Sequence, residues 1–173
     1  MPCQICCTSK LLTEFRLTSA QAPKPQEGNL IGTWYAHLFY TDGKKCIVMI
    51  NAASGYCVVG MYMSRAEIQQ IPELIRLDLL QLMREDGFSD AQIDRVQEEI
   101  RESVVCRTND RTAVSFLSRY ILDITYQVVD RNIFNGLELA RIMNHGISGP
   151  AWNPIKAFNN VIDGIPVEIR KKY

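Results

Sequence analysis

The sequence predicts an α+β domain, in which an antiparallel β-meander that is mainly N-terminal packs against several helices. The first 63 residues hold most of the strand-like sequence, and the segments that follow show the three- and four-residue apolar spacing of helices. One strand-like run returns only at 104–108, which does not fit the regular strand–helix alternation of a doubly wound fold. The length of 173 residues and the 47% hydrophobic content predict a single domain over residues 1–173.

Turn residues separate the strands that we expect before residue 63. The pair Asp42-Gly43 favours the positive φ angles of a tight hairpin turn, so the runs on its two sides should pair. The stretch 22–29 contains two prolines and a glycine and predicts a loop, and a helical turn at 9–15 precedes it. The expected strands of this region are 4–7, 33–40, 45–50 and 56–61.

Helix start signals dominate from residue 64 onward. Ser64 and Glu67 fit a capping box, and Pro72 suits the first turn of a second helix that Gly87 would end. A third helix should open at Ser89, and the run 104–108 should return to the same sheet as a short strand.

The longest predicted helix covers residues 111–130. Its apolar residues from Val114 to Val128 recur at helical spacing, so we expect it to pack on the Trp34 side of the hairpin. Two shorter helices should follow, at 134–144 and 154–163. The end of the chain reads as a strand from residue 165 and then as a frayed tail at 170–173.

Composition and cysteine usage restrict the class of protein. The 19 basic and 19 acidic residues cancel, which argues against a protein that holds DNA by charge alone. The longest apolar run, 46–50, is too short to cross a membrane, and the N-terminus has no signal-peptide pattern, so we expect a cytoplasmic protein. Cys3, Cys6 and Cys7 include a C-x-x-C spacing but lack a second pair of ligands; we expect packing rather than metal, and no cofactor.

Four short motifs resemble those of a known family. They are Trp34-Tyr35-Ala36-His37-Leu38, Lys45-Cys46, Asn51 and Thr108-Asn109-Asp110-Arg111-Thr112. On these motifs the sequence resembles a family of small bacterial proteins that is catalogued only as a domain of unknown function. The resemblance implies one bacterial cytoplasmic domain and no established activity.

Basic side chains and one histidine are the candidates for chemistry. The candidate catalytic residues are His37, Lys45 and Arg111, and the candidate anion-binding residues are Lys44, Arg107 and Arg111. The plain alternatives are a surface histidine on the solvent side of the sheet and arginines engaged in internal salt bridges. Because the sequence has no phosphate-binding glycine loop and no recognisable catalytic set, it leaves open whether the protein is an enzyme.

Charge along the chain favours a binding function. Residues 64–103 carry 5 basic and 10 acidic side chains, so the helices there should present an acidic face. We therefore expect a non-enzymatic interaction or regulatory module that binds a protein partner or self-associates. The alternative is a small nucleic-acid- or nucleotide-processing enzyme with an anion site built from His, Lys and Arg. Nucleic-acid binding through Arg170-Lys171-Lys172 has weaker support, because three terminal charges are more often solubilising than specific.

Overall fold

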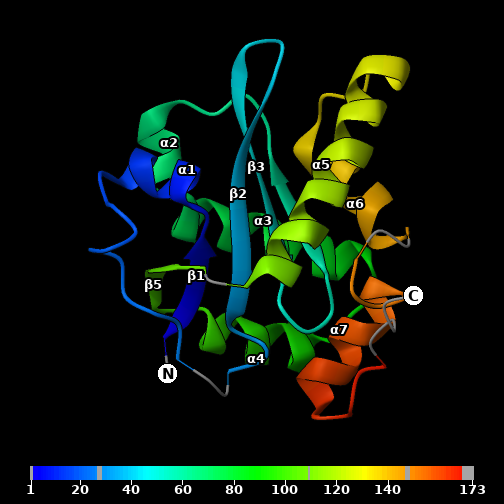
Figure 1. The fold of residues 1–173 in the computed structure, drawn as a ribbon. Helices are drawn as coiled ribbons and strands as arrows, with labels where there is room; N and C mark the ends of the chain where they lie inside the picture. Colours follow the sequence, from blue (N-terminus) through cyan, green and yellow to red (C-terminus); the bar gives the residue numbers. More distant parts are fainter. Residues whose placement is uncertain (1, 27–28, 109, 147–148, 169–173) are drawn as a thin grey trace.

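The computed structural model describes residues 2–26, 29–108, 110–146 and 149–168, and it contains a five-stranded sheet with helices on both faces (Figure 1). The strands lie in the order β4-β3-β2-β1-β5. Their bounds are β1 Cys3–Cys7, β2 Thr33–Thr41, β3 Lys44–Asn51, β4 Cys57–Gly60 and β5 Ser103–Arg107. The helices are α1 Ser9–Leu12, the 3₁₀ helix η1 Thr13–Phe15, α2 Arg65–Gln69, α3 Ile71–Glu85, α4 Asp90–Glu99, α5 Arg111–Arg131, α6 Gly136–Asn144 and α7 Pro154–Asp163.

The sheet is mixed, so the prediction of an antiparallel meander is wrong for part of it. Strands β2, β3 and β4 form the predicted antiparallel meander, but β1 pairs in parallel with both β2 and β5. Long connections precede β2 and β5. Each connection returns the chain to the end of the sheet at which the preceding strand began, so the next strand runs in the same direction. All five residues of β1 are buried, the pattern of a central parallel strand covered on both faces.

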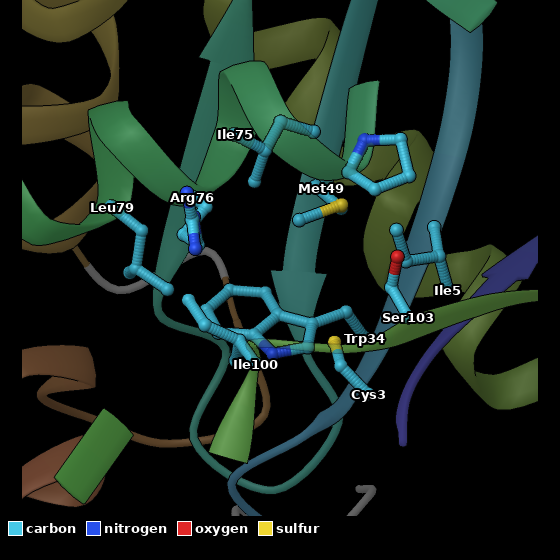
Figure 2. Close-up of a pocket in the computed structure, with 10 residues that line it drawn as sticks. Cys3, Ile5, Trp34, Met49, Ile75, Arg76, Leu79, Ile100 and Ser103 are labelled. Carbon is cyan, nitrogen blue, oxygen red and sulfur yellow. The ribbon is translucent and has the colours of Figure 1, made fainter. Parts of the chain in front are cut away.

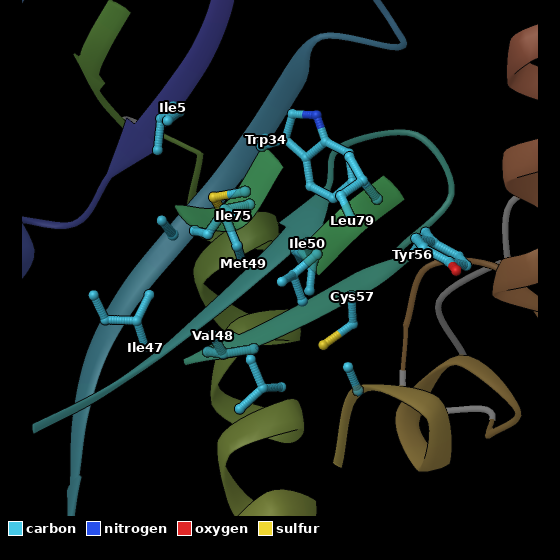
Figure 3. Close-up of a cluster of buried hydrophobic side chains, with 14 of the residues drawn as sticks. Ile5, Trp34, Ile47, Val48, Met49, Ile50, Tyr56, Cys57, Ile75 and Leu79 are labelled. Carbon is cyan, nitrogen blue, oxygen red and sulfur yellow. The ribbon is translucent and has the colours of Figure 1, made fainter. Parts of the chain in front are cut away.

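The side chains of β2 divide the sheet into two faces. The Trp34 face carries Trp34, Ala36 and Leu38, and α3 packs against it: Ile75 and Leu79 lie beside Trp34 and Met49. The Tyr35 face carries Tyr35, His37 and their neighbours on β3 and β4, and α5 and α6 cover it. Figure 3 shows Trp34, Met49, Ile75 and Leu79 together, with Val48 and Cys57 pointing toward the opposite helices.

Trp34 therefore does not face the longest helix, contrary to the prediction. It is buried against α3 and α7, where its ring meets Phe158 edge-on at 5.7 Å, while α5 packs on the other side of β2 and β3. The alternation of side chains along β2 correctly predicted that Trp34 and His37 lie on opposite faces of the sheet. It could not say which helix covers which face, because both faces are apolar enough to be buried.

Local signals located the other elements well. The capping boxes at Ser64 and Ser89 are formed, Asp110 caps α5, and Gly87 and Gly164 end their helices with positive φ angles. The predicted loop at 22–29 contains no helix or strand in its described residues, 22–26 and 29. The predicted strand from residue 165 is wrong for 165–168, which have no regular structure, and the predicted frayed tail at 170–173 lies outside the described residues.

At each edge of the sheet, another part of the chain bonds to one residue of the outer strand. On the β4 edge, the side-chain amide of Asn144 accepts a bond from the Cys57 N–H at 2.6 Å and donates to the Cys57 carbonyl at 3.0 Å. On the β5 edge, the Arg107 N–H donates to the Pro23 carbonyl at 2.9 Å. Unpaired strand edges invite pairing with another chain, so these contacts protect the sheet from it.

No helix in the described parts of the chain combines the length and the apolar character that a membrane span requires.

Candidate functional site

His37 and the start of α5 lie near the point where the parallel strands β1 and β5 end. After β1 the chain enters α1, which lies on the Trp34 face, because Glu14 of η1 pairs with Lys45 and Lys10 of α1 lies over the ring of Tyr40. After β5 the chain enters α5 on the Tyr35 face (Figure 1). Neighbouring parallel strands whose connections leave on opposite faces form the position where open α/β sheets bind ligands.

His37 lies beside this position on the Tyr35 face. Its Nδ1 atom is 2.7 Å from the Thr8 hydroxyl at the end of β1. Burial lowers the pKa of His37, and the nearby Lys10 lowers it further. A half-buried imidazole that is neutral at pH 7 can accept or relay a proton, so His37 is chemically competent although it is not the solvent-facing histidine of the plain alternative.

The start of α5 approaches the same position from the next strand. The Tyr35 hydroxyl donates to the Asp110 carboxylate at 3.3 Å, and Asp110 also accepts the N–H groups of Thr112 and Ala113. Burial, together with Asp110, raises the pKa of Tyr35 to about 12, so its hydroxyl stays protonated. Because Asp110 already occupies these amides, the helix start is a capped end and does not offer them to an anion. Arg111 follows it and is exposed.

The other candidate cations are held elsewhere. Lys45 lies on the Trp34 face, 2.8 Å from the buried Glu14 carboxylate, and Arg65 also approaches Glu14 at 3.6 Å. Lys44 lies over the Tyr62 ring with its Nζ atom 4.6 Å from the ring centre. Arg107 donates to the Ser19 carbonyl at 2.8 Å. The structure therefore places His37 on the same face as the α5 start and Arg111, but it does not bring Lys44 or Lys45 to them.

The cysteines behave as apolar filling. All six are free and buried, and burial raises the pKa of Cys3 and Cys6 to about 12, with Cys106 contributing. A thiol with such a pKa has almost no reactive thiolate at pH 7. Among the described residues, no three His, Cys, Asp or Glu side chains gather in a way that could hold a metal ion.

One polar cluster has no counterpart in the sequence-based predictions. The Asp86 carboxylate at the end of α3 is fully buried; it accepts the Tyr56 hydroxyl at 2.5 Å and lies 3.4 Å from Nε2 of His145. His145 is also the C-cap residue of α6, so this contact joins the end of α6 to the end of α3. The three residues come from positions 56, 86 and 145, so no spacing in the sequence could have revealed the cluster. It connects the ends of α3 and α6 to the start of β4.

The cavity beside Trp34 is too small for an organic ligand. Figure 2 shows it between the sheet and α3, with Trp34, Met49, Ile75 and Leu79 on its walls. Its volume is about 20 Å³, room for about one water molecule. Two larger hollows, of about 480 and 390 Å³, border residues 164–168.

The most distinctive surface lies on the outer side of α5. Leu122, Tyr126 and Val129 are 71%, 51% and 64% exposed, and they follow one another at i, i+4 and i+7, which places them on one line along the helix. Val114 extends this line toward the helix start and is also exposed. We call these four residues the α5 stripe. The stripe was not predicted, because the sequence pattern placed Val114 in the apolar line of α5 that faces the sheet; Val114 is instead exposed.

The acidic helices form a different surface. Asp94, Glu98 and Glu102 are exposed on and after α4, as the sequence predicted, and Arg101 lies 3.4 Å from Glu98. An exposed acidic face with its own partly neutralising arginine is a common solvated surface.

A comparison with family models matches residues 4–153 to a domain of unknown function, DUF6933, and the chain therefore belongs to this family. The resemblance found in the sequence motifs is confirmed. The matched range contains Thr8, His37 and all of α5. A search of curated proteins found no match to the chain.

Proposed function

We propose that this DUF6933 domain is a non-enzymatic interaction module that binds a protein partner through the α5 stripe. The observation that carries the proposal is the exposure of Leu122, Tyr126 and Val129 along one line of a 21-residue helix. Single exposed apolar residues are normal on a protein surface, but a continuous line of large ones marks an interaction site. Exposure of these apolar side chains to water is unfavourable, and a bound partner would remove that exposure.

The proposal moves the docking surface from the acidic helices to α5. Charged surfaces such as Asp94 and Glu98 increase association rates but contribute little affinity. Large apolar and aromatic side chains at the centre of an interface contribute most of the binding energy. Leu122 and Tyr126 have this character, whereas the exposed face of α4 is charged.

Site-specific crosslinking in the native cells tests this proposal. A photo-reactive phenylalanine analogue replaces Leu122 in one strain and Glu98 of the acidic face in another. We expect protein crosslinks from position 122 that disappear when Val129→Glu is added, and few from position 98. Crosslinks from position 98 alone would instead favour the acidic face, and no crosslinks from position 122 would refute the proposal.

A second candidate function rests on His37. Its imidazole lies 2.7 Å from the Thr8 hydroxyl at the end of two parallel strands, which supports a proton-transferring role in a nucleotide-processing enzyme. The absence of Lys44 and Lys45 from its surroundings weakens the anion site that such an enzyme would use. Titration with ATP, followed through the imidazole NMR signals, tests it: the signal of His37 should shift while that of His145 should not. A pair of unmoved signals would remove this candidate.

A further inference from the structure

We infer that the partner of the α5 stripe is a second copy of this chain, bound so that the two α5 helices lie antiparallel about a two-fold axis. The inference rests on the proposed function, since it names the partner of the same surface. A two-fold dimer needs a surface that complements itself. Three features of α5 meet this requirement.

The first feature is the order of apolar residues along the helix. In an antiparallel helix pair, the residue numbers of facing residues add to the same sum throughout. A sum of 248 sets the register in which Leu122 faces Tyr126 of the second copy. The two-fold axis repeats this contact in reverse. Val129 then lies over the aliphatic stem of Arg119 of the second copy. This register therefore covers Leu122, Tyr126 and Val129 of the α5 stripe.

The second feature is the pair of charges beside the stripe. Arg119 and Asp130 are both exposed, and in the described part of the chain neither has an ion-pair partner. They are 11 residues apart, which places them about 16 Å apart along the axis and within about 20° on the same side of the helix. Antiparallel packing brings Arg119 close to Asp130 of the second copy, twice per dimer. A parallel two-fold pair would place Arg119 and Asp130 of the second copy on the opposite flank of the interface, so these ion pairs would not form.

The third feature is the opposite side of the stripe, which has no charge to bury. The Ser118 hydroxyl donates to the Val114 carbonyl at 2.9 Å, and the Thr125 hydroxyl donates to the Ile121 carbonyl at 2.7 Å. These hydroxyls therefore already have hydrogen-bond acceptors within the helix. A second copy can cover them without leaving an unpaired donor.

At both sheet edges, some strand residues that could pair with a second copy are already bonded in the described part of the chain. Asn144 covers the β4 edge at Cys57, and Pro23 covers the β5 edge at Arg107. Edge-to-edge pairing would have to displace these bonds. The α5 stripe needs no such rearrangement, because its side chains are already exposed.

Sedimentation equilibrium of the purified chain tests the inference. We expect a concentration-dependent dimer, of twice the 19.7 kDa of the chain, and we expect Leu122→Lys to be a monomer. Leu77→Lys is the matched control, because Leu77 is 57% exposed on α3, away from the stripe, and this variant should still dimerise. Circular dichroism verifies that both variants fold, as exposed positions allow.

Charge exchange tests the orientation. Arg119→Asp and Asp130→Arg should each raise the dimer dissociation constant about tenfold at low salt, because each single change creates two repulsive pairs. The double variant restores opposite charges and should return to within about threefold of the original value. Equal dissociation constants for all four proteins would overturn the antiparallel arrangement.

Three outcomes distinguish the failure of this inference from the failure of the proposed function. A purified chain that stays monomeric, while position 122 crosslinks to a different protein in cells, would overturn self-association and leave the interaction module intact. A monomer without any crosslink from position 122 would overturn both. A dimer that survives Leu122→Lys would show that the copies associate through another surface, and it would also overturn the inference.

Discussion

Helices are held on the two faces of the sheet by different interactions. On the Trp34 face, ring packing dominates: Phe158 of α7 stacks on Tyr56 at 5.0 Å and meets Trp34 and Phe88 edge-on. The helices of the Tyr35 face are fixed by hydrogen bonds to the edge strand β4 and to the turn that precedes it. The Tyr120 hydroxyl of α5 donates to the Gly55 carbonyl at 2.6 Å, and Asn144 of α6 bonds to both backbone groups of Cys57.

This difference shows how each face is specified. Ring packing depends on filled volume, so its energy is lost when a side chain is shortened. Hydrogen bonds to buried backbone groups set the position of a helix, because a shifted helix would leave those groups unpaired. The Tyr35 face therefore holds α5 in one orientation, and that orientation decides which line of α5 stays exposed.

The largest expected effect is on the Trp34 face. Phe158→Ala should lower the free energy of unfolding by about 3–5 kcal/mol, because it removes a fully buried ring and leaves a cavity between three other rings. Urea denaturation measures the change. Phe134→Ala is the control, since Phe134 is exposed, and it should cost much less. Equal costs for the two variants would contradict the importance of ring packing.

A smaller loss is expected when the β4 edge loses its cover. Asn144→Ala leaves the N–H and the carbonyl of Cys57 unpaired and buried, so the free energy of unfolding should fall by about 2–4 kcal/mol. The control on the same helix is Asn135→Ala, which removes an exposed N-cap and should cost about 1 kcal/mol. Amide hydrogen exchange of Cys57 should also accelerate in the first variant only. Unchanged exchange there would show that the edge is protected by something else.

Removing one hydroxyl of α5 tests how much its hydrogen bond stabilises the Tyr35 face. Tyr120→Phe keeps the buried ring and removes only the bond to the Gly55 carbonyl, so urea denaturation should show a loss of about 1 kcal/mol. Tyr126→Phe is the matched control at an exposed position and should show no loss. If Tyr120→Phe lowered the free energy of unfolding as much as Phe158→Ala, the proposed difference between the two faces would be contradicted.

The sequence revealed those parts of the fold that depend on neighbouring residues. Asp42 and Gly43 both adopt positive φ angles, as the hairpin prediction required, and the capping box at Ser64 involves residues only three apart. The parallel pairing of β1 with β5 was missed because it joins segments about 100 residues apart. No turn or cap records such a pairing; only the continuous burial of Cys3–Cys7 hints at it.

The sequence identified residues with suitable chemistry for the candidate site, but it did not reveal which of them lie close together. His37 was identified, but its contact Thr8 comes 29 residues earlier, and the partner of Lys45 is Glu14 on the opposite face. The exposed stripe of α5 was overlooked for a related reason. Apolar residues lie on two sides of this helix, and sequence alone does not say which side meets the sheet.

The smallest expected effect concerns the pH dependence of stability through His37. Since burial lowers the pKa of folded His37, the unfolded chain binds a proton more readily, and the folded state loses stability as the pH falls below about 6.5. Above that pH the imidazole is neutral in both states and contributes no pH dependence. Urea denaturation at pH 7.5 and 5.5 should therefore show a smaller difference for His37→Gln than for the unchanged chain. His145→Gln, at the exposed histidine beside Asp86, serves as the comparison. If His37→Gln leaves the difference as it was, the half-buried imidazole does not contribute to the pH dependence of folding.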